Sequence, residues 1–251
     1  MAVASCAARS MAFPTDPGAP FADYAAVHAE LSKACASVRT LTAELALSGR
    51  AGSQRMRGRV VSGFEQPASV RLEGVAPFGP PAFILASRGA GATLLLPRDN
   101  AVLRGEPFAE ILGALTGVSL APADLQAVLT GCVEAAPSAT AGWTHGNGWV
   151  SIDLAGGSVV YLRRMAEAWQ VAGARRDRWE IEYGDWQGTF PRQVRLRSTD
   201  PEVNVDLTAA VNQLETNVDI PPEAFGVNVP QDAIAITLDE LRAAGPLRAD
   251  D

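Results

Sequence analysis

The sequence predicts one mainly β domain of the α+β class: an incompletely closed antiparallel β-barrel of about eleven strands, with helices covering its open, concave side. The first observation behind this is an alternation of apolar and polar residues along most of the chain, as in LTAELALS at 41–48. The second is that short linkers containing glycine or proline separate these runs, which is typical of antiparallel neighbours. The third is the lack of an internal repeat or a mid-chain linker, so residues 21–251 are expected to form a single domain.

The composition narrows the class of protein further. Hydrophobic residues make up 47% of the chain and charged residues 20%, so the chain can bury a sizeable core. A net charge of −7 argues against a nucleic-acid binder, which would carry a basic stripe. No apolar run approaches the roughly 18 residues that a membrane-spanning helix needs. Because His28 and His145 stand alone and no C-x-x-C spacing occurs, we expect neither a metal site nor a cofactor.

The first half of the chain should begin with a helix and continue as strands. Asp23 can cap a helix whose apolar face carries Tyr24, Val27, Leu31 and Cys35. The period then changes to two, which predicts strands at 41–48, 55–60, 70–75, 82–87 and 93–96. Two short helices are expected next, at 107–115 and 121–129, with Pro122 in the first turn of the second and with Gly117 and Gly131 as C-terminal caps.

The second half of the chain returns to the strand pattern. Alternation predicts strands at 149–154, 159–163, 169–174, 179–183, 193–197 and 203–211. Short helices around 222–225 and 238–243 should close the chain. A sheet of this many strands curls, and helices against its inner face can leave an apolar pocket.

The loop between strands 70–75 and 82–87 is unusual. Loop tips generally carry polar residues, but this one holds Phe78 between Pro77, Gly79 and Pro80. Prolines restrict the backbone, so the tip should be stiff. Two interpretations stay open: Phe78 projects from the molecule, or it folds back onto the edge of the sheet as ordinary core.

No motif of an enzyme is present. AGGSVVY around Ser158 lacks the second glycine of a nucleophile elbow, and Gly89 and Gly91 precede a strand instead of the helix that a dinucleotide loop must open. Glu180 and Glu182 share one face of a strand, as many solvent-facing pairs do. His145 is most simply a turn residue. We therefore expect no catalytic activity.

The N-terminus contains a possible lipidation signal. Val3-Ala4-Ser5-Cys6 resembles the lipobox of bacterial lipoproteins, in which the cysteine receives the lipid. A signal peptide needs an apolar region of about 7–15 residues before the cleavage site. Only five residues precede Cys6 here, so either the natural start lies upstream or the match is chance. Residues 1–20 are expected to form a signal remnant and a flexible tether.

Four segments in order resemble a known family. LSGR at 47–50, VRLEGVAPFG at 70–79, ILGALTGV at 111–118 and LQAVLTG at 125–131 resemble the lipoprotein-localisation receptor family LolB and, more loosely, its periplasmic carrier relative LolA. These pieces cover residues 40 to 131. Beyond them the likeness is limited to the strand pattern and to Asn217, Phe225 and Pro230.

The resemblance implies a non-catalytic protein that binds acyl chains of lipoproteins in an apolar cavity and helps localise them to the outer membrane. It implies lipidation of Cys6, an outer-membrane location facing the periplasm, and a membrane-inserting loop at Pro77, Phe78, Gly79 and Pro80. Expected partners are lipoprotein acyl chains, outer-membrane lipid and a periplasmic LolA-like carrier, and we expect a monomer. Candidates for the cavity lining, which could equally be packed core, are Leu45, Leu47, Val60, Leu72, Leu85 and Leu95.

Two alternatives remain beside this prediction. The protein could be a structural or interaction lipoprotein of the cell envelope that has the same fold but a filled core. Cys35 and Cys132 could pair as a disulfide in an oxidising periplasm, or remain two buried thiols that behave as small apolar residues.

Overall fold

The computed structural model describes residues 11–133, 138–201 and 203–244, and its strands form one sheet of fifteen. The helices are α1 (Tyr24–Ala36), α2 (Phe108–Thr116), α3 (Pro122–Thr130) and α4 (Leu238–Ala244). The strands are β1 (Ala19–Pro20), β2 (Thr40–Ala51), β3 (Gln54–Glu65), β4 (Ser69–Val75), β5 (Phe83–Arg88), β6 (Ala92–Leu96), β7 (Ala101–Arg104), β8 (Ala139–Thr144), β9 (Trp149–Leu154), β10 (Val159–Met165), β11 (Ala168–Arg176), β12 (Trp179–Gly184), β13 (Gln193–Ser198), β14 (Val205–Thr216) and β15 (Ile234–Ala235).

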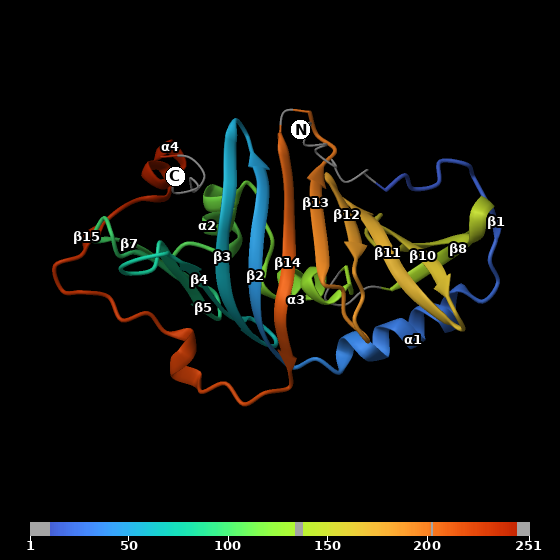
Figure 1. Cartoon of the computed structure of the whole chain (residues 1–251), viewed down its shortest axis with the longest axis horizontal. Coiled ribbons are helices and arrows are strands. Elements are labelled where there is room, and N and C mark those ends of the chain that lie inside the picture. The colour runs from blue at the N-terminus through green and yellow to red at the C-terminus, as the bar shows by residue number, and fades with distance from the viewer. Residues whose placement is uncertain (1–10, 134–137, 202, 245–251) are drawn as a thin grey trace, which may run out of the picture.

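The sheet is built from two antiparallel meanders joined in the middle. Strands β2 to β7 follow one another in space, as do β8 to β14, and the long pair β14–β2 joins the two sets from Val205–Ala51 to Thr216–Leu41. In Figure 1, β2, β3 and β14 cross the middle of the molecule, with α2 and α3 behind them. The helices therefore cover one face of a curved sheet, which we call the inward face. The opposite face is the outer face.

The sheet is open and has fifteen strands, whereas the sequence predicted an incompletely closed barrel of about eleven. Its edge strands are β1, which pairs with β8, and β15, which lies parallel to β7. The sequence missed β7 because Ala101, Val102 and Leu103 are all buried, so no alternation marks that strand. It missed β8 because alanine, threonine and glycine dominate that segment and only Trp143 is a strong strand former.

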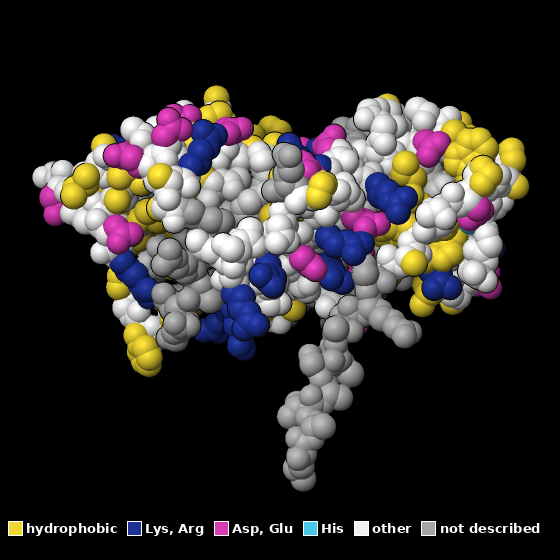
Figure 2. Space-filling model, turned by 90° about the horizontal axis from the view of Figure 1, so that it is seen from above, with side chains coloured by type: hydrophobic (Ala, Val, Ile, Leu, Met, Phe, Trp, Pro, Cys, Tyr) yellow, Lys and Arg dark blue, Asp and Glu magenta, His cyan; other side chains and the backbone are white. Residues whose placement is uncertain are grey.

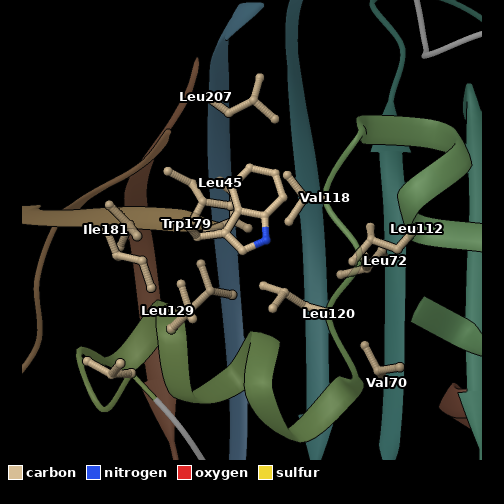
Figure 3. Close-up of a cluster of buried hydrophobic side chains, with 14 of the residues drawn as sticks. Leu45, Val70, Leu72, Leu112, Val118, Leu120, Leu129, Trp179, Ile181 and Leu207 are labelled. Carbon is tan, nitrogen blue, oxygen red and sulfur yellow. The ribbon is translucent and has the colours of Figure 1, made fainter. Parts of the chain in front are cut away.

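The core lies between the sheet and α2 and α3. One inward row runs across five strands through the register pairs Ala43–Ser62, Ser62–Leu72, Leu72–Leu85 and Leu85–Leu94. Figure 3 shows Leu45 and Leu72 of this face close to Leu112, Leu120 and Leu129 from the helical region. Both helices end as expected, with Gly117 and Gly131 in the left-handed conformation.

Helix α1 is fixed to the rest of the molecule at both ends. Near its start, Tyr24 packs on Gly142 of β8, where an added Cβ would lie 2.3 Å from the Cβ of Tyr24. At its end, Cys35 forms a disulfide with Cys132, just after α3. Asp23 occupies the N-cap position, but its side chain makes no capping hydrogen bond.

Residues 11–20, expected as part of a flexible tether, are attached to the sheet: Phe13 packs on its outer face, and Ala19–Pro20 pair with β8 at its edge. Phe13 is buried, and its ring stacks on Tyr161 with 4.4 Å between centroids. Gly173 leaves the room for this ring, because an added Cβ would lie 2.3 Å from Phe13. The packed domain therefore begins before residue 21. Cys6 lies outside the described residues.

Candidate functional site

The loop at 76–82 holds Phe78 away from the sheet. Phe78 is 89% exposed, the largest exposed fraction among the exposed large hydrophobic side chains of the described residues. Gly79 has φ = +79°, a conformation that glycine adopts without strain, and Pro77 and Pro80 are exposed on either side. The loop is closed by a hydrogen bond from the Ala82 N–H to the Gly74 carbonyl, at 2.9 Å. The alternative in which Phe78 folds back onto the sheet edge does not occur.

A cavity of about 770 Å³ lies next to this loop. Its inward-facing lining is mostly apolar and comes from neighbouring strands: Leu47, Met56, Gly58, Val60, Gly74 and Phe83. Pro77 and Ala82 from the Phe78 loop contribute to its wall, together with Arg98 and Asp99 of the β6–β7 turn. The exposed loop and the cavity are therefore parts of one site.

Two glycines shape the cavity in opposite ways. Gly58 is directly opposite Leu47 on the inward face, and a Cβ built there would meet no atom within 4 Å. Gly58 is also exposed, so the cavity is open to solvent at this point. Gly74 by contrast is covered by the Phe83 ring, which would lie 2.5 Å from an added Cβ. The space over Gly58 is therefore room that the fold leaves unfilled.

The six residues expected to line a cavity divide into three groups. Leu47 and Val60 line it. Leu45, Leu72 and Leu85 face the same side but are buried in the packed core, because α2 and α3 cover that part of the sheet. Leu95 lies on the opposite face, since it pairs with Ile84 and Val102 while Leu94 pairs with the inward Leu85. The prediction that Leu95 faces inward is therefore wrong. Strand β6 is buried on both faces, so its sequence shows no alternation of apolar and polar residues that would indicate which face is inward.

The outer face of β11 to β14 carries paired charges. Glu180 is buried and lies opposite Arg175 on one side and Arg197 on the other, with an ion pair to each. Arg195 donates two hydrogen bonds to Asp206, at 2.8 and 2.7 Å, and these lower the pKa of that carboxyl. The carboxylates of this face therefore form ion pairs with arginines on neighbouring strands, which is a structural role.

One arrangement of side chains has the spacing of a catalytic triad. His145 Nε2 is 2.9 Å from the Ser151 hydroxyl, and His145 Nδ1 is 3.1 Å from the Asp16 carboxylate. A nucleophilic hydroxyl must reach its substrate, but Ser151 is 3% exposed in the middle of β9. The contact instead ties the N-terminal segment to the sheet, and it lowers the pKa of Asp16. No sequence pattern indicated this contact, because Asp16 and His145 are 129 positions apart.

The described part of the chain offers no cluster of metal-ligating side chains. Within the same residues, no helix has the length and apolarity needed to cross a membrane. The exposed Phe78 ring and the open cavity beside it form the candidate ligand site.

Comparison with solved structures supports the fold. A LolA superfamily protein from Nitrosomonas europaea superimposes with a TM-score of 0.54 at 9% identity, covering 80% of this chain and 97% of the other. A DUF1329 family protein from Desulfovibrio piger gives a TM-score of 0.50 at 12% identity, covering 82% and 97%. No protein-family model and no curated protein matches the sequence. The suspected likeness to the LolA family is therefore confirmed for the fold.

Proposed function

We propose that this chain binds acyl chains of lipoproteins in the cavity over Gly58 and helps to place them in the outer membrane, without covalent chemistry. The observation that carries the proposal is the continuity between an open, largely apolar cavity of about 770 Å³ and an exposed phenylalanine on its rim. Cavities that bind small ligands commonly measure about 300–1,000 Å³. The shared fold with a LolA superfamily structure supports the same class of ligand.

The energetics suit reversible transfer. Each methylene moved from water into an apolar site contributes about 0.8 kcal/mol, so an acyl chain is held firmly while it remains in the cavity. Because the cavity is open at Gly58, the chain can leave by the same path. Phe78 would enter the bilayer beside this opening and bring the cavity mouth to the lipid.

The proposed location is the periplasmic face of the outer membrane, with Cys6 as the lipidated anchor. A single acyl chain holds a protein only weakly, so a second contact such as Phe78 is useful even to an anchored protein. A periplasmic LolA-like carrier is the proposed source of the cargo. The protein would act as a monomer.

A second candidate function is favoured by the packed part of the core. Leu45, Leu72 and Leu85 are buried under the helices, so much of the concave face has no room for a ligand. A structural or interaction lipoprotein of the envelope needs only this filled core and an outer surface. The two functions differ in whether the space over Gly58 takes up an acyl chain.

The deciding experiment fills that space. Gly58→Leu should fit without strain, because a Cβ meets no atom within 4 Å there, and its side chain should occupy the cavity. Binding of a dansyl-labelled fatty acid, followed by fluorescence, should weaken at least tenfold. Gly58→Ala, the matched control, adds one methyl group and should bind nearly as the parent protein does.

Two results would contradict the proposal. If the parent protein does not take up the probe, the filled-core function is the better one. If Gly58→Leu binds the probe as tightly as Gly58→Ala, the acyl chain binds elsewhere.

A further inference from the structure

Four arginines form a basic row on the outer face of β2 and β3. The row consists of Arg50, Arg55, Arg57 and Arg59, and all four are exposed. From residue 55 to residue 59 it extends about 13 Å along β3. In Figure 2, dark-blue side chains gather at the lower middle of the view, over the position of these two strands. This concentration stands out in a chain of net charge −7.

Three of the four arginines in the basic row lack the ion-paired carboxylates that accompany arginines elsewhere on the same face. On β11 to β13, Arg175, Arg195 and Arg197 are each directly opposite a glutamate. On β3, Arg57 is opposite Ser48 and Arg59 is opposite Ala46. Among the residues that the structure describes, none forms an ion pair with Arg50, Arg55 or Arg57, while Arg59 lies 3.5 Å from Glu44.

Two of these arginines are placed unfavourably for the fold. Arg50 and Arg55 are directly opposite each other across the β2–β3 ladder, and like charges in that position destabilise a sheet. Asp206 is opposite Arg50 on the other side, but its carboxylate accepts both hydrogen bonds from Arg195. Packing within the chain therefore gives no reason for the row, whereas an external anion would.

The row lies at the same end of the sheet as Phe78. Arg59 is opposite Val75, the last residue of β4 before the Phe78 loop, and Arg57 lies beyond the end of that pairing. Arg57 and Arg59 share the cavity lining with Pro77. A flat surface that met the exposed ring of Phe78 could therefore meet the guanidinium groups at the same time.

We propose that the basic row binds the anionic headgroups of a phospholipid membrane and so turns the cavity mouth toward the bilayer. Guanidinium groups form bidentate hydrogen bonds with phosphate, and each basic residue near an anionic membrane surface strengthens binding about fivefold. A membrane explains the row and Phe78 together, because it offers phosphates and an apolar phase side by side. The inference rests on the proposed function for its purpose, but it can be tested separately.

The test measures co-sedimentation of the full chain with vesicles of phosphatidylcholine alone and with 30% phosphatidylglycerol. The double variant Arg50→Gln/Arg55→Gln removes two positive charges from the part of the row that does not line the cavity. The matched control, Arg88→Gln/Arg104→Gln, also removes two positive charges from exposed positions. Both arginines are the last residues of their strands, β5 and β7, at the end of the sheet away from the Phe78 loop. Uptake of the dansyl fatty acid is measured in parallel on all three proteins.

The parent protein should bind the anionic vesicles more tightly than the neutral ones. The row variant should lose about 25-fold in this binding, as two arginines at about fivefold each, and the control should change little. Raising the salt concentration should weaken the binding of the parent and control proteins to anionic vesicles by the same factor, because charges at a surface are screened beyond about 8 Å at 0.15 M. All three proteins should take up the fatty acid equally.

Other outcomes overturn the inference. Equal losses in both double variants would show an effect of net charge without a site. Unchanged vesicle binding by the row variant, with impaired lipoprotein transfer from a carrier protein, would assign the row to an acidic protein partner. If the parent protein takes up fatty acid but prefers no anionic vesicle, the headgroup site is wrong while the proposed function stands. If fatty-acid uptake fails but anionic vesicle binding depends on the row, the proposed function is wrong and the headgroup site stands.

Discussion

Phe78 at the tip of its loop and Phe83 at the start of the strand that follows have opposite environments. Phe83 is buried, because strand alternation places it on the inward face and Gly74 leaves room for its ring. Phe78 is 89% exposed, because the loop is held off the sheet by prolines and by the left-handed Gly79. The backbone on either side, more than the residue type, decides which ring enters the core.

Replacement of Phe78 by serine should weaken membrane binding and leave the fold unchanged. Burial of the ring in lipid contributes about 2 kcal/mol, so partitioning into neutral vesicles should fall about thirtyfold. The melting temperature should stay the same, since the exposed side chain has little packing to lose. Met165→Ser is the control, because Met165 is 58% exposed on a different hairpin. A similar loss in both variants would show that the effect is not specific to Phe78.

At the scale of elements, the helices cover the sheet but do not reach the cavity. The disulfide joins Cys35, in the last turn of α1, to Cys132, just after α3. The buried Gln126 side chain of α3 also donates a hydrogen bond to the Val38 carbonyl, just after α1, at 3.2 Å. Helix α2 ends at Gly117, where an added Cβ would lie 2.8 Å from Val205 of β14. These contacts hold the helices over the middle of the sheet and leave the end near Gly58 uncovered.

Removal of the disulfide should destabilise the protein without unfolding the cavity. Cys35 and Cys132 are 97 residues apart, and a crosslink that closes a long loop contributes about 2–4 kcal/mol. The free energy of unfolding of Cys35→Ser/Cys132→Ser, measured in urea, should fall by that amount. A reducing agent should lower the free energy of unfolding of the parent protein to that of the variant, and it should leave the variant's value unchanged. An equal midpoint for the parent protein with and without reductant would contradict the prediction.

At the scale of the whole molecule, the N-terminal segment and the cavity occupy different halves of the sheet. Phe13 packs on the outer face over Tyr161, Trp149 and Gly173, in the second meander. The cavity lies around Gly58, at the end of the first meander that the helices leave uncovered, and Leu47, Met56 and Val60 line it from the inward face. The pair β14–β2 is the main connection between them, so stability and ligand binding should be separable.

Two substitutions should separate these properties. Phe13→Ala removes a buried ring and should lower the free energy of unfolding by about 3 kcal/mol while leaving fatty-acid uptake intact. Gly58→Leu should abolish most uptake while the stability changes little. Thermal melts and probe titrations of the same samples measure both. Loss of uptake in Phe13→Ala at temperatures where it remains folded would show that the two halves are coupled.

The sequence by itself determined the local features of this protein. Alternation located most long strands, helical spacing located α1, α2 and α3, and Gly117 and Gly131 marked two helix ends, because these signals depend on neighbours within a few residues. The likeness to the LolA family rested on short motifs at 47–131 and correctly indicated the fold. The prolines and glycine around Phe78 likewise indicated an unusual loop tip, because they are its neighbours in the sequence.

Tertiary structure alone decided where space remains and which charges are paired. Leu45 and Leu47 have the same spacing and type, but α2 and α3 bury the first in the core while the second borders the cavity. The openness of the sheet, the place of Phe13 on its outer face and the lack of carboxylates beside Arg55 and Arg57 depend on strands far apart in the chain. Periodicity specifies which side of a strand faces inward, but only the packing of distant elements determines whether that side is filled.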